Sequence, residues 1–197
     1  MRVEEAEAWL KVPPEEKLNF CHSDESMFPL CGTANQKNNV RWALHGNHGG
    51  EGRPFDHVFH KPTKSRQIMV FLGVHSSGKC FGLHFFEEKE TLTGEKYQAL
   101  LEEKIFPEIE QLNTLEHGTL NRMWWQQDGA PAHKTKKVKK LLAEKFGNRQ
   151  FALGNTAGAP QHAPCSCDFA VLDIFVWPEL KRKVYVDPMP RTIEVQF

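Results

Sequence analysis

Hydrophobic and polar positions alternate most clearly in the middle of the chain. Residues 67–75 and 79–86 are two runs rich in apolar side chains, joined by a Ser-Ser-Gly turn, and this pattern predicts a β-hairpin. Residues 93–113 carry apolar side chains every three or four positions, which predicts an amphipathic helix. Thr91 or Thr93 is suited to cap its start. The repeating apolar positions are Tyr97, Leu100, Leu101, Ile105, Ile109 and Leu112.

The patterns outside this region are weaker but follow the same rules. Residues 1–16 are acidic and helical in character, and a Pro-Pro pair ends that segment. The other expected elements are strands over 17–23, 121–127 and 150–153, short strands around 40–42 and 57–60, helices over 134–146 and 169–183, and a Gly/Ala/Pro loop over 154–167. Strands followed by alternating helices and strands predict an α/β fold with a mixed central sheet. At 197 residues the chain suits one domain with its own core.

Three aspartates lie in or beside apolar runs. Asp24 follows a short apolar stretch, Asp128 follows the run Met-Trp-Trp, and Asp173 lies inside the apolar run 169–177. A carboxylate in apolar surroundings has a desolvation cost unless a cation meets it. Hard divalent cations bind carboxylate oxygens. Three such acids, far apart in the sequence, therefore suggest one shared metal site.

Two-metal phosphoryl-transfer enzymes use a few carboxylates to hold two ions about 3.5–4 Å apart, and these ions clamp the attacking and leaving oxygens. Taken singly, Asp24 would suit a turn or a helix cap, and Asp128 would suit an Asp-Gly turn. Asp173 is harder to explain alone, because an acid between Leu172 and Ile174 needs a partner. The metal-site hypothesis therefore depends on the three acids together.

Three blocks of sequence carry a resemblance to a known family. They are Ser23-Asp24-Glu25, then Trp125-Gln126-Gln127-Asp128-Gly129-Ala130-Pro131-Ala132-His133, and then Ser166-Cys167-Asp168 with Asp173-Ile174-Phe175-Val176-Trp177 and Leu180-Lys181. In these blocks the chain resembles mariner-type transposases, which are DDE/DDD cut-and-paste DNA transposases. The third block keeps both aspartates at the family's five-residue offset. The prolines and the asparagine of the family pattern Ser-Pro-Asp-Leu-Asn-Pro-x-Asp are replaced.

The resemblance implies a fold and a chemistry. The fold would be RNase H-like, with Asp24 on the first strand, Asp128 just after the fourth and Asp173 on the helix after the fifth. These three residues would be catalytic and would hold two Mg²⁺ or Mn²⁺ ions, with no small-molecule cofactor. The reaction would be phosphodiester hydrolysis and strand transfer in DNA transposition. DNA would be the partner, the nucleus the location and a homodimer the expected assembly, since the family generally dimerises.

The expected domain boundaries follow from this resemblance. They are a helical lead-in over 1–16, an RNase H-like catalytic domain over 17–185 and a C-terminal tail over 186–197. Family members carry N-terminal helix-turn-helix modules ahead of the catalytic core. This sequence begins shortly before Asp24, so we expect those modules to be absent from it.

Net charge does not indicate nucleic-acid binding, because 25 basic and 25 acidic residues balance. Basic residues are nevertheless concentrated over 134–149, and a local basic face suits phosphate contacts. The expected DNA contacts are Lys134, Lys136, Lys137 and Lys140, which would meet backbone phosphates without distinguishing bases. A solvated amphipathic helix explains the same pattern, and the two interpretations are compatible.

Residues beside the aspartates allow several interpretations. His133, which we also count among the nucleic-acid contacts, could meet phosphate, orient Asp128 as a neutral donor, or start the helix without a role. Glu25 would point away from the site if its strand continues, so we expect no ligand role for it. Asp168 fits a cap before the last helix. The large aromatic residues are predicted to lie in the core: Trp42, Trp124, Trp125, Phe175 and Trp177, with Trp9 packing the first helix.

The five cysteines suggest no disulfide framework and indicate reduced thiols. Cys165 and Cys167 with His162 invite a zinc hypothesis, but Cys-x-Cys is a poor spacing for structural zinc and no second pair exists. No run of 18 apolar residues is present, so no membrane span is expected.

Three functions remain open from the sequence. The first is a transposase catalytic domain, and the second is a transposon-derived nucleic-acid-binding protein without catalysis. The third is an RNase H-like nuclease, which would cleave without joining ends. Metal binding separates the second from the others, and strand joining separates the first from the third.

Overall fold

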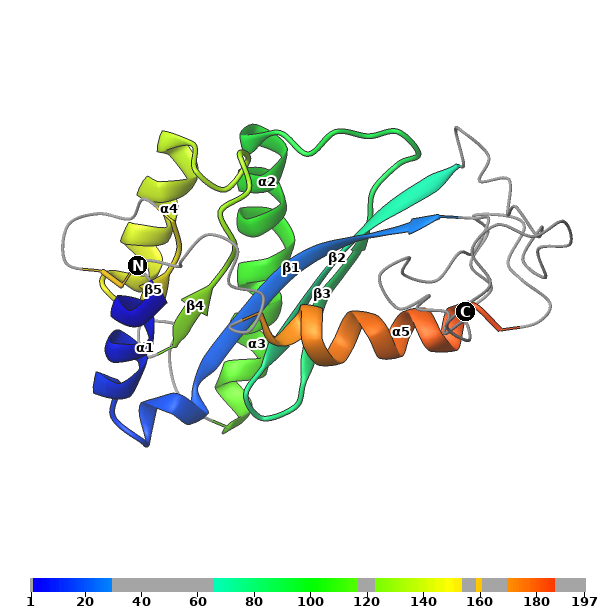
Figure 1. Cartoon of the computed structure of the whole chain (residues 1–197). Coiled ribbons are helices and arrows are strands. Elements are labelled where there is room, and N and C mark those ends of the chain that lie inside the picture. The colour runs from blue at the N-terminus through cyan, green and yellow to red at the C-terminus, as the bar shows by residue number, and fades with distance from the viewer. Residues whose placement is uncertain (1, 30–65, 117–122, 154–158, 161–169, 187–197) are drawn as a thin grey trace, which may run out of the picture.

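The computed structural model describes residues 2–29, 66–116, 123–153, 159–160 and 170–186. Within them, five strands form one mixed sheet in the order β3-β2-β1-β4-β5. The strands are β1 Phe20–Pro29, β2 Gln67–His75, β3 Cys80–Phe85, β4 Trp124–Gln126 and β5 Gln150–Phe151. β1 is antiparallel to β2 and parallel to β4, and β4 is parallel to β5. The expected α/β fold with a mixed central sheet is confirmed (Figure 1).

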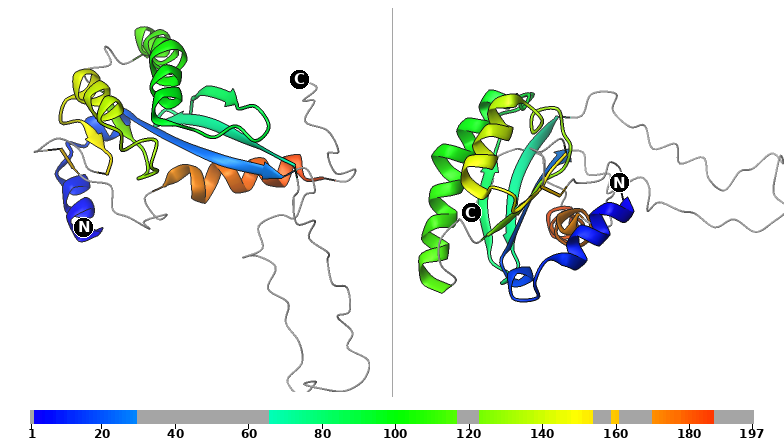
Figure 2. Two further views of the ribbon diagram at one scale, coloured as in Figure 1. Left: turned by 90° about the horizontal axis from the view of Figure 1, so that it is seen from above. Right: turned by 90° about the vertical axis from the view of Figure 1, so that its left-hand side faces the viewer.

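Helices cover both faces of this sheet. They are α1 Arg2–Lys11, α2 Gly94–Leu100, α3 Phe106–Glu116, α4 Lys136–Phe146 and α5 Trp177–Val184. A π-helical turn, Leu101–Ile105, joins α2 to α3, and a second one, Leu172–Val176, leads into α5. Figure 2 shows α2, α3 and α4 on one face of the sheet and α5 on the other.

The core follows from the alternation of side chains along β2. Phe71 packs against the face covered by α2, α3 and α4, while Val70 and Leu72 pack against Leu172 and Trp177 on the α5 side. Successive residues of a strand point to opposite faces, so one strand contributes to both layers. Trp125 is fully buried on the first face, stacked on Phe146 with ring centroids 5.5 Å apart.

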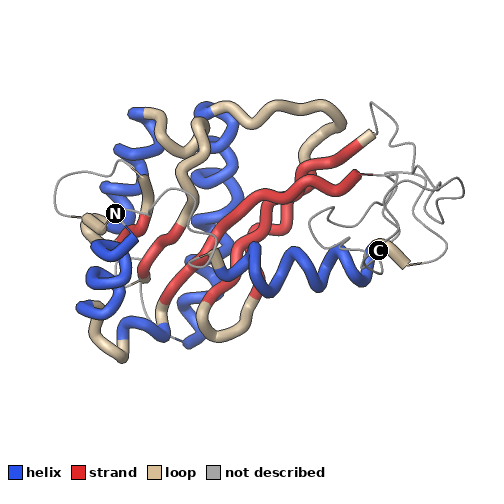
Figure 3. Tube along the Cα trace, in the orientation of Figure 1, coloured by secondary structure: helices blue, strands red, loops and turns tan. Residues whose placement is uncertain are grey.

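Several predicted elements are confirmed. The β2–β3 hairpin is present, and the helix expected over 93–113 forms as α2, the π turn and α3. The Thr93 side chain accepts a hydrogen bond from the Lys96 backbone N–H, so Thr93 is the cap. The strands and helices of the second half appear in the predicted order, as the trace in Figure 3 shows.

The first strand was misplaced by the sequence pattern. β1 begins at Phe20 and continues to Pro29, because its residues pair with β2 from Cys21↔His75 to Pro29↔Gln67. Asp24 therefore lies inside the first strand, as the resemblance implied, although the sequence pattern had ended that strand at residue 23. The residues before it form a single 3-10 turn, Glu16–Leu18.

The aromatic predictions have mixed outcomes. Trp124, Trp125 and Trp177 are buried, and Trp9 packs edge-on against Phe20 with ring centroids 4.5 Å apart. The prediction for Phe175 was wrong, because its side chain is 68% exposed. The predictions for Trp42, the strands around 40–42 and 57–60, Asp168, the Cys165–Cys167 zinc site and most of the loop over 154–167 lie outside the described residues.

Candidate active site

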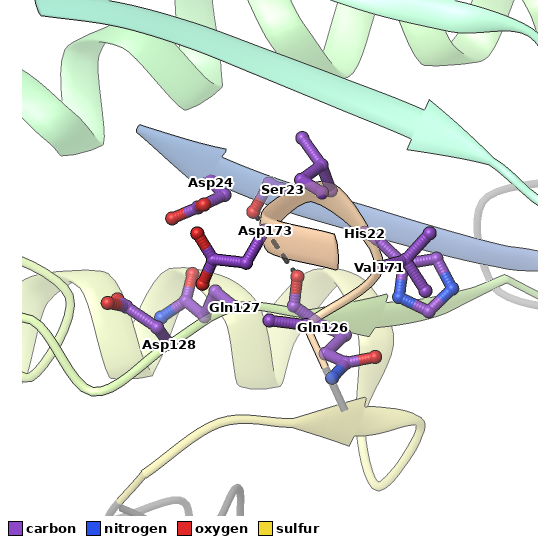
Figure 4. A pocket seen from close by; sticks show the side chains of 10 residues that line it. His22, Ser23, Asp24, Gln126, Gln127, Asp128, Val171 and Asp173 are labelled. Atoms are coloured by element: carbon purple, nitrogen blue, oxygen red, sulfur yellow. Dashed lines mark hydrogen bonds between the residues drawn. The ribbon is translucent and has the colours of Figure 1, made fainter. Parts of the chain in front are cut away.

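The three predicted aspartates line one pocket. It lies on the α5 side of the sheet, between β1, the end of β4 and the start of the last helical segment (Figure 4). Its lining residues are His22, Ser23, Asp24, Gln126, Gln127, Asp128, Ala170, Val171, Leu172 and Asp173. Three segments that are far apart in the sequence thus bring Asp24, Asp128 and Asp173 to one pocket.

Strand pairing explains how two of the acids meet. β1 and β4 are parallel neighbours, and their last paired positions are His22 and Gln126. Asp24 and Asp128 each lie two residues beyond those positions, so both acids reach the same end of the parallel pair. Asp173 comes from the π turn Leu172–Val176, which the buried Leu172 anchors to the sheet.

Asp24 is a largely buried carboxylate. Its Oδ2 accepts a 2.7 Å hydrogen bond from Trp177 Nε1. Burial is the main cause that raises the pKa of Asp24 to about 7, and the negative charges of Asp173, Glu25 and Asp128 add to it. The Trp177 hydrogen bond opposes this rise, because it stabilises the ionised form. The surroundings of Asp24 therefore supply too little positive charge to stabilise its ionised carboxylate.

Asp128 is held differently. Its side chain is 48% exposed, and its Oδ1 accepts a 2.9 Å hydrogen bond from the Ala130 backbone N–H. The same Oδ1 lies 2.7 Å from Nδ1 of His133. The Asp-Gly-Ala-Pro turn expected from the sequence therefore forms, and it fixes the carboxylate from both sides of the turn.

His133 is buried between two acids. Its Nε2 lies 3.3 Å from Glu25 Oε2, its side chain is 1% exposed, and its ring packs against Tyr97 with centroids 4.1 Å apart. Burial lowers the pKa of His133, but the hydrogen bonds and charges of Asp128 and Glu25 outweigh burial and raise it to about 10. This pKa makes His133 a cation near neutral pH, whereas one of the three interpretations of the sequence had a neutral histidine orienting Asp128.

Asp173, like Asp128, is exposed. Its side chain makes no hydrogen bond or ion pair with the rest of the described chain. Its charge acts on Asp24 across the pocket and on Lys181 of α5. Lys181 donates a 2.7 Å hydrogen bond to Ser26 Oγ, so this cation lies on the pocket side of the sheet.

The acids suit a divalent cation by their chemistry. Carboxylate oxygens are the ligands that Mg²⁺ and Mn²⁺ prefer, and a cation would relieve the repulsion that raises the pKa of Asp24. The described part of the chain nevertheless contains no group of three or more His, Cys, Asp and Glu side chains close enough to hold a metal ion. The residue types around the pocket fit such an ion.

The predicted DNA-contacting lysines lie on or beside α4, which covers the sheet face opposite α5 (Figure 2). Lys134 and Lys136 are exposed at its start. Lys137 pairs with Glu95 at 2.9 Å, and Lys140 lies 3.7 Å from Glu144. Two of the four lysines are therefore partly neutralised, although exposed pairs of this kind are weak.

Three contacts at the site have no local signal in the sequence. Trp177 binds Asp24, Lys181 binds Ser26, and Glu25 pairs with His133, although each of these residues stood in or beside the blocks that carry the resemblance. Cys21 is buried and Cys80 is exposed, and neither is in a disulfide. Among the described helices, none combines the length and apolarity needed to cross a membrane.

No family model matches the sequence, and no curated protein matches it. Solved structures of Mos1 transposase are similar in fold. The Mos1 paired-end complex with the left transposon end aligns with 93% of this chain and 46% of that chain, at 14% identity and a TM-score of 0.56. The Mos1 strand transfer complex aligns with 92% and 45%, at 14% identity and a TM-score of 0.55.

The Mos1 transposase catalytic domain, solved with Raltegravir and Mg, aligns with 92% of this chain and 67% of that chain, at 13% identity and a TM-score of 0.51. The chain thus spans less than half of the Mos1 chain in the DNA complexes and two thirds of the catalytic domain. At these identities the likeness concerns the fold. The chain has the RNase H-like fold of a mariner-type transposase catalytic domain.

Proposed function

We propose that this protein is a DNA transposase catalytic domain that carries out metal-dependent phosphodiester hydrolysis and strand transfer. The observation that supports this most directly is the convergence of Asp24, Asp128 and Asp173 on one pocket from three separate segments. The Mos1 structures, which include complexes with transposon ends, share its fold. The expected partner is DNA, the expected location is the nucleus, and the expected assembly is a homodimer.

The proposed chemistry assigns a task to each residue. Asp24, Asp128 and Asp173 would hold two Mg²⁺ or Mn²⁺ ions, which when bound activate a water or a DNA 3′-hydroxyl and stabilise the leaving oxygen. Trp177 holds one oxygen of Asp24, and His133 holds one oxygen of Asp128. Asp173 is exposed and lines the same pocket. No covalent protein intermediate is required.

DNA would meet this pocket through its backbone phosphates. Lys181 offers a contact beside the acids, whereas the lysines of 134–140 lie on or beside α4, which covers the opposite face of the sheet. Phosphate contacts position DNA without distinguishing its sequence. We therefore expect weak, salt-dependent DNA binding by this domain.

The competing function is nucleic-acid binding without catalysis. One observation favours it: the third block lacks the family's prolines and asparagine. An RNase H-like nuclease is the other alternative. Metal binding and strand joining, measured in that order, separate the three.

The first experiment is calorimetric titration of Mn²⁺ into the wild type, Asp128→Asn and Asp173→Asn. We expect binding by the wild type and a loss of at least about tenfold in affinity in each variant. Glu88→Gln is the matched control, because it removes an exposed carboxylate paired with Arg66 far from the pocket. Absent binding, or binding that Asp173→Asn leaves unchanged, would favour the non-catalytic function.

A supercoiled plasmid then tests the reaction itself. Nicking that requires Mn²⁺ and all three aspartates would support catalysis. Joining of a labelled DNA 3′-end to the plasmid would support a transposase, and cleavage without joining would support a nuclease.

A further inference from the structure

Two neighbouring residues of β1 point to opposite faces of the sheet. Asp24 faces the pocket on the α5 side, where Trp177 binds it. Glu25 faces the side covered by α2 and α4, where its carboxylate is 11% exposed and lies 3.3 Å from His133 Nε2. Because strand side chains alternate, Glu25 does not point into the pocket. Glu25 is connected to the pocket residue Asp128 only through a third residue.

That residue is His133, which connects the two faces. Its other ring nitrogen, Nδ1, lies 2.7 Å from Asp128 Oδ1. Glu25, His133 and Asp128 thus form a chain of close contacts that starts behind β1 and ends in the pocket. We call these three residues the acid–histidine–acid relay.

Packing fixes the histidine ring in this chain. The ring lies 4.1 Å from the Tyr97 ring, and the Tyr97 hydroxyl donates a 2.9 Å hydrogen bond to Gln127 Oε1. The same Gln127 oxygen accepts a 3.0 Å hydrogen bond from Trp125 Nε1. All of these side chains are buried, so the ring has little freedom to turn.

We propose that Glu25 is a positioning residue for metal binding, acting through His133 on the orientation of Asp128. This inference rests on the proposed function. Asp128 is half exposed and lies on the turn after β4, and His133 Nδ1 binds the same Oδ1 that accepts the Ala130 N–H hydrogen bond, so the histidine helps to set the orientation of this carboxylate. Groups that bind and orient metal ligands affect metal affinity by about 10–100-fold when they are removed.

The burial of Glu25 supports the same assignment. A carboxylate this deeply buried is costly unless it is paired, and the relay supplies its partner. A purely structural acid at this place would stabilise the Asp128 turn but would not alter metal affinity beyond its effect on folding. The two roles therefore predict different measurements.

The first measurement is Mn²⁺ affinity by calorimetry on the full 197-residue chain. Glu25→Gln should weaken binding at least about tenfold while the protein stays folded. His133→Ala should weaken it similarly, and His133→Asn should restore part of it, because the Asn amide can donate to Asp128 as Nδ1 does. Glu108→Gln is the matched control, since Glu108 accepts a hydrogen bond from the Gly82 N–H away from the pocket.

The second measurement needs no metal. Proton NMR of the metal-free wild type should show imidazole N–H signals of His133 that are protected from exchange with water. Asp128→Asn should shift the Nδ1–H signal, and Glu25→Gln should shift the Nε2–H signal.

The outcomes separate the relay from the proposed function. Mn²⁺ binding that Asp128→Asn abolishes but Glu25→Gln leaves intact would overturn the relay and leave the function standing. Absence of Mn²⁺ binding by the wild type would contradict the function. Missing protected N–H signals, or signals that neither substitution shifts, would overturn the relay whether or not metal binds.

Discussion

Replacement of Asp24 by asparagine should stabilise the metal-free protein. The structure raises the pKa of Asp24 from 3.8 to about 7, chiefly because the carboxylate is buried and because Asp173 repels it. The folded state therefore binds a proton more tightly than the unfolded state does. Stability contributed by this proton is present below about pH 4 and is lost as the pH rises through about 7.

The magnitude follows from the same shift. A difference of about three pKa units corresponds to about 4 kcal/mol, so the ionised Asp24 lowers the free energy of unfolding at pH 8 by up to about that amount. Asparagine has no charge to bury and still accepts the Trp177 N–H hydrogen bond. We expect Asp24→Asn to be about 2–4 kcal/mol more stable than the wild type at pH 8.

The assay is urea denaturation of both proteins in EDTA at several pH values. The difference in free energy of unfolding should shrink as the pH falls from about 7 to about 4, because the wild type becomes protonated. Saturating Mn²⁺ should reverse the order, since it stabilises only the protein that binds it. An Asp24→Asn variant that is less stable at pH 8, or a difference that does not depend on pH, would refute this reasoning.

Three further predictions concern neighbours of the acids. Burial lowers the pKa of His22 from 6.5 to about 4, so protonation of His22 should oppose folding by up to about 3 kcal/mol as the pH drops from 6.5 to 4 and offset part of the gain from Asp24; His22→Gln should lack this loss in the same urea titrations. Trp177→Phe removes the donor to Asp24, and calorimetry should show Mn²⁺ affinity lowered about tenfold. Lys181 lies on the pocket side and Lys140 on the opposite helix layer, so Lys181→Gln should weaken binding of a labelled DNA duplex more than Lys140→Gln and reduce its salt slope by about one. Equal effects of the two lysine variants would place the DNA elsewhere.

The elements that the sequence predicted well are those with a strong local pattern. The hairpin and the long helix have regular spacing and clear turn or cap residues, so tertiary contacts were not needed to locate them. β1 was misplaced because Ser23, Asp24, Glu25 and Ser26 form a polar run that resembles the end of a strand. Pairing with β2 along the whole of β1 outweighs that local preference.

The last helix shows a different limit. Leu172 and Trp177 are both buried although they are five positions apart, because the turn between them is π-helical. This spacing turns Phe175 outward, where an uninterrupted apolar run had suggested burial. A regular helical period cannot predict such a change of phase from one sequence.

The candidate site was predictable only in part, for a similar reason. The three acids could be identified from their apolar surroundings and from the resemblance. Their partners could not, because the Trp177–Asp24 hydrogen bond joins residues 153 positions apart, and the Glu25–His133 pair depends on how α4 approaches β1. Contacts of this kind are set by packing between elements and leave no periodic signal.

The electrostatics of the pocket bear on the choice between catalysis and simple DNA binding. Carboxylates repel phosphate, so a surface that only binds the DNA backbone is weakened by acids at its centre. Here three acids share one pocket, and the buried His133 is already paired with Glu25 and Asp128. Burial and the repulsion between the acids chiefly affect Asp24, whose ionised form has an electrostatic cost in the folded protein near neutral pH. A divalent cation bound between the acids would remove that cost and make the same pocket attractive to phosphate, which is the arrangement that metal-dependent phosphoryl transfer requires.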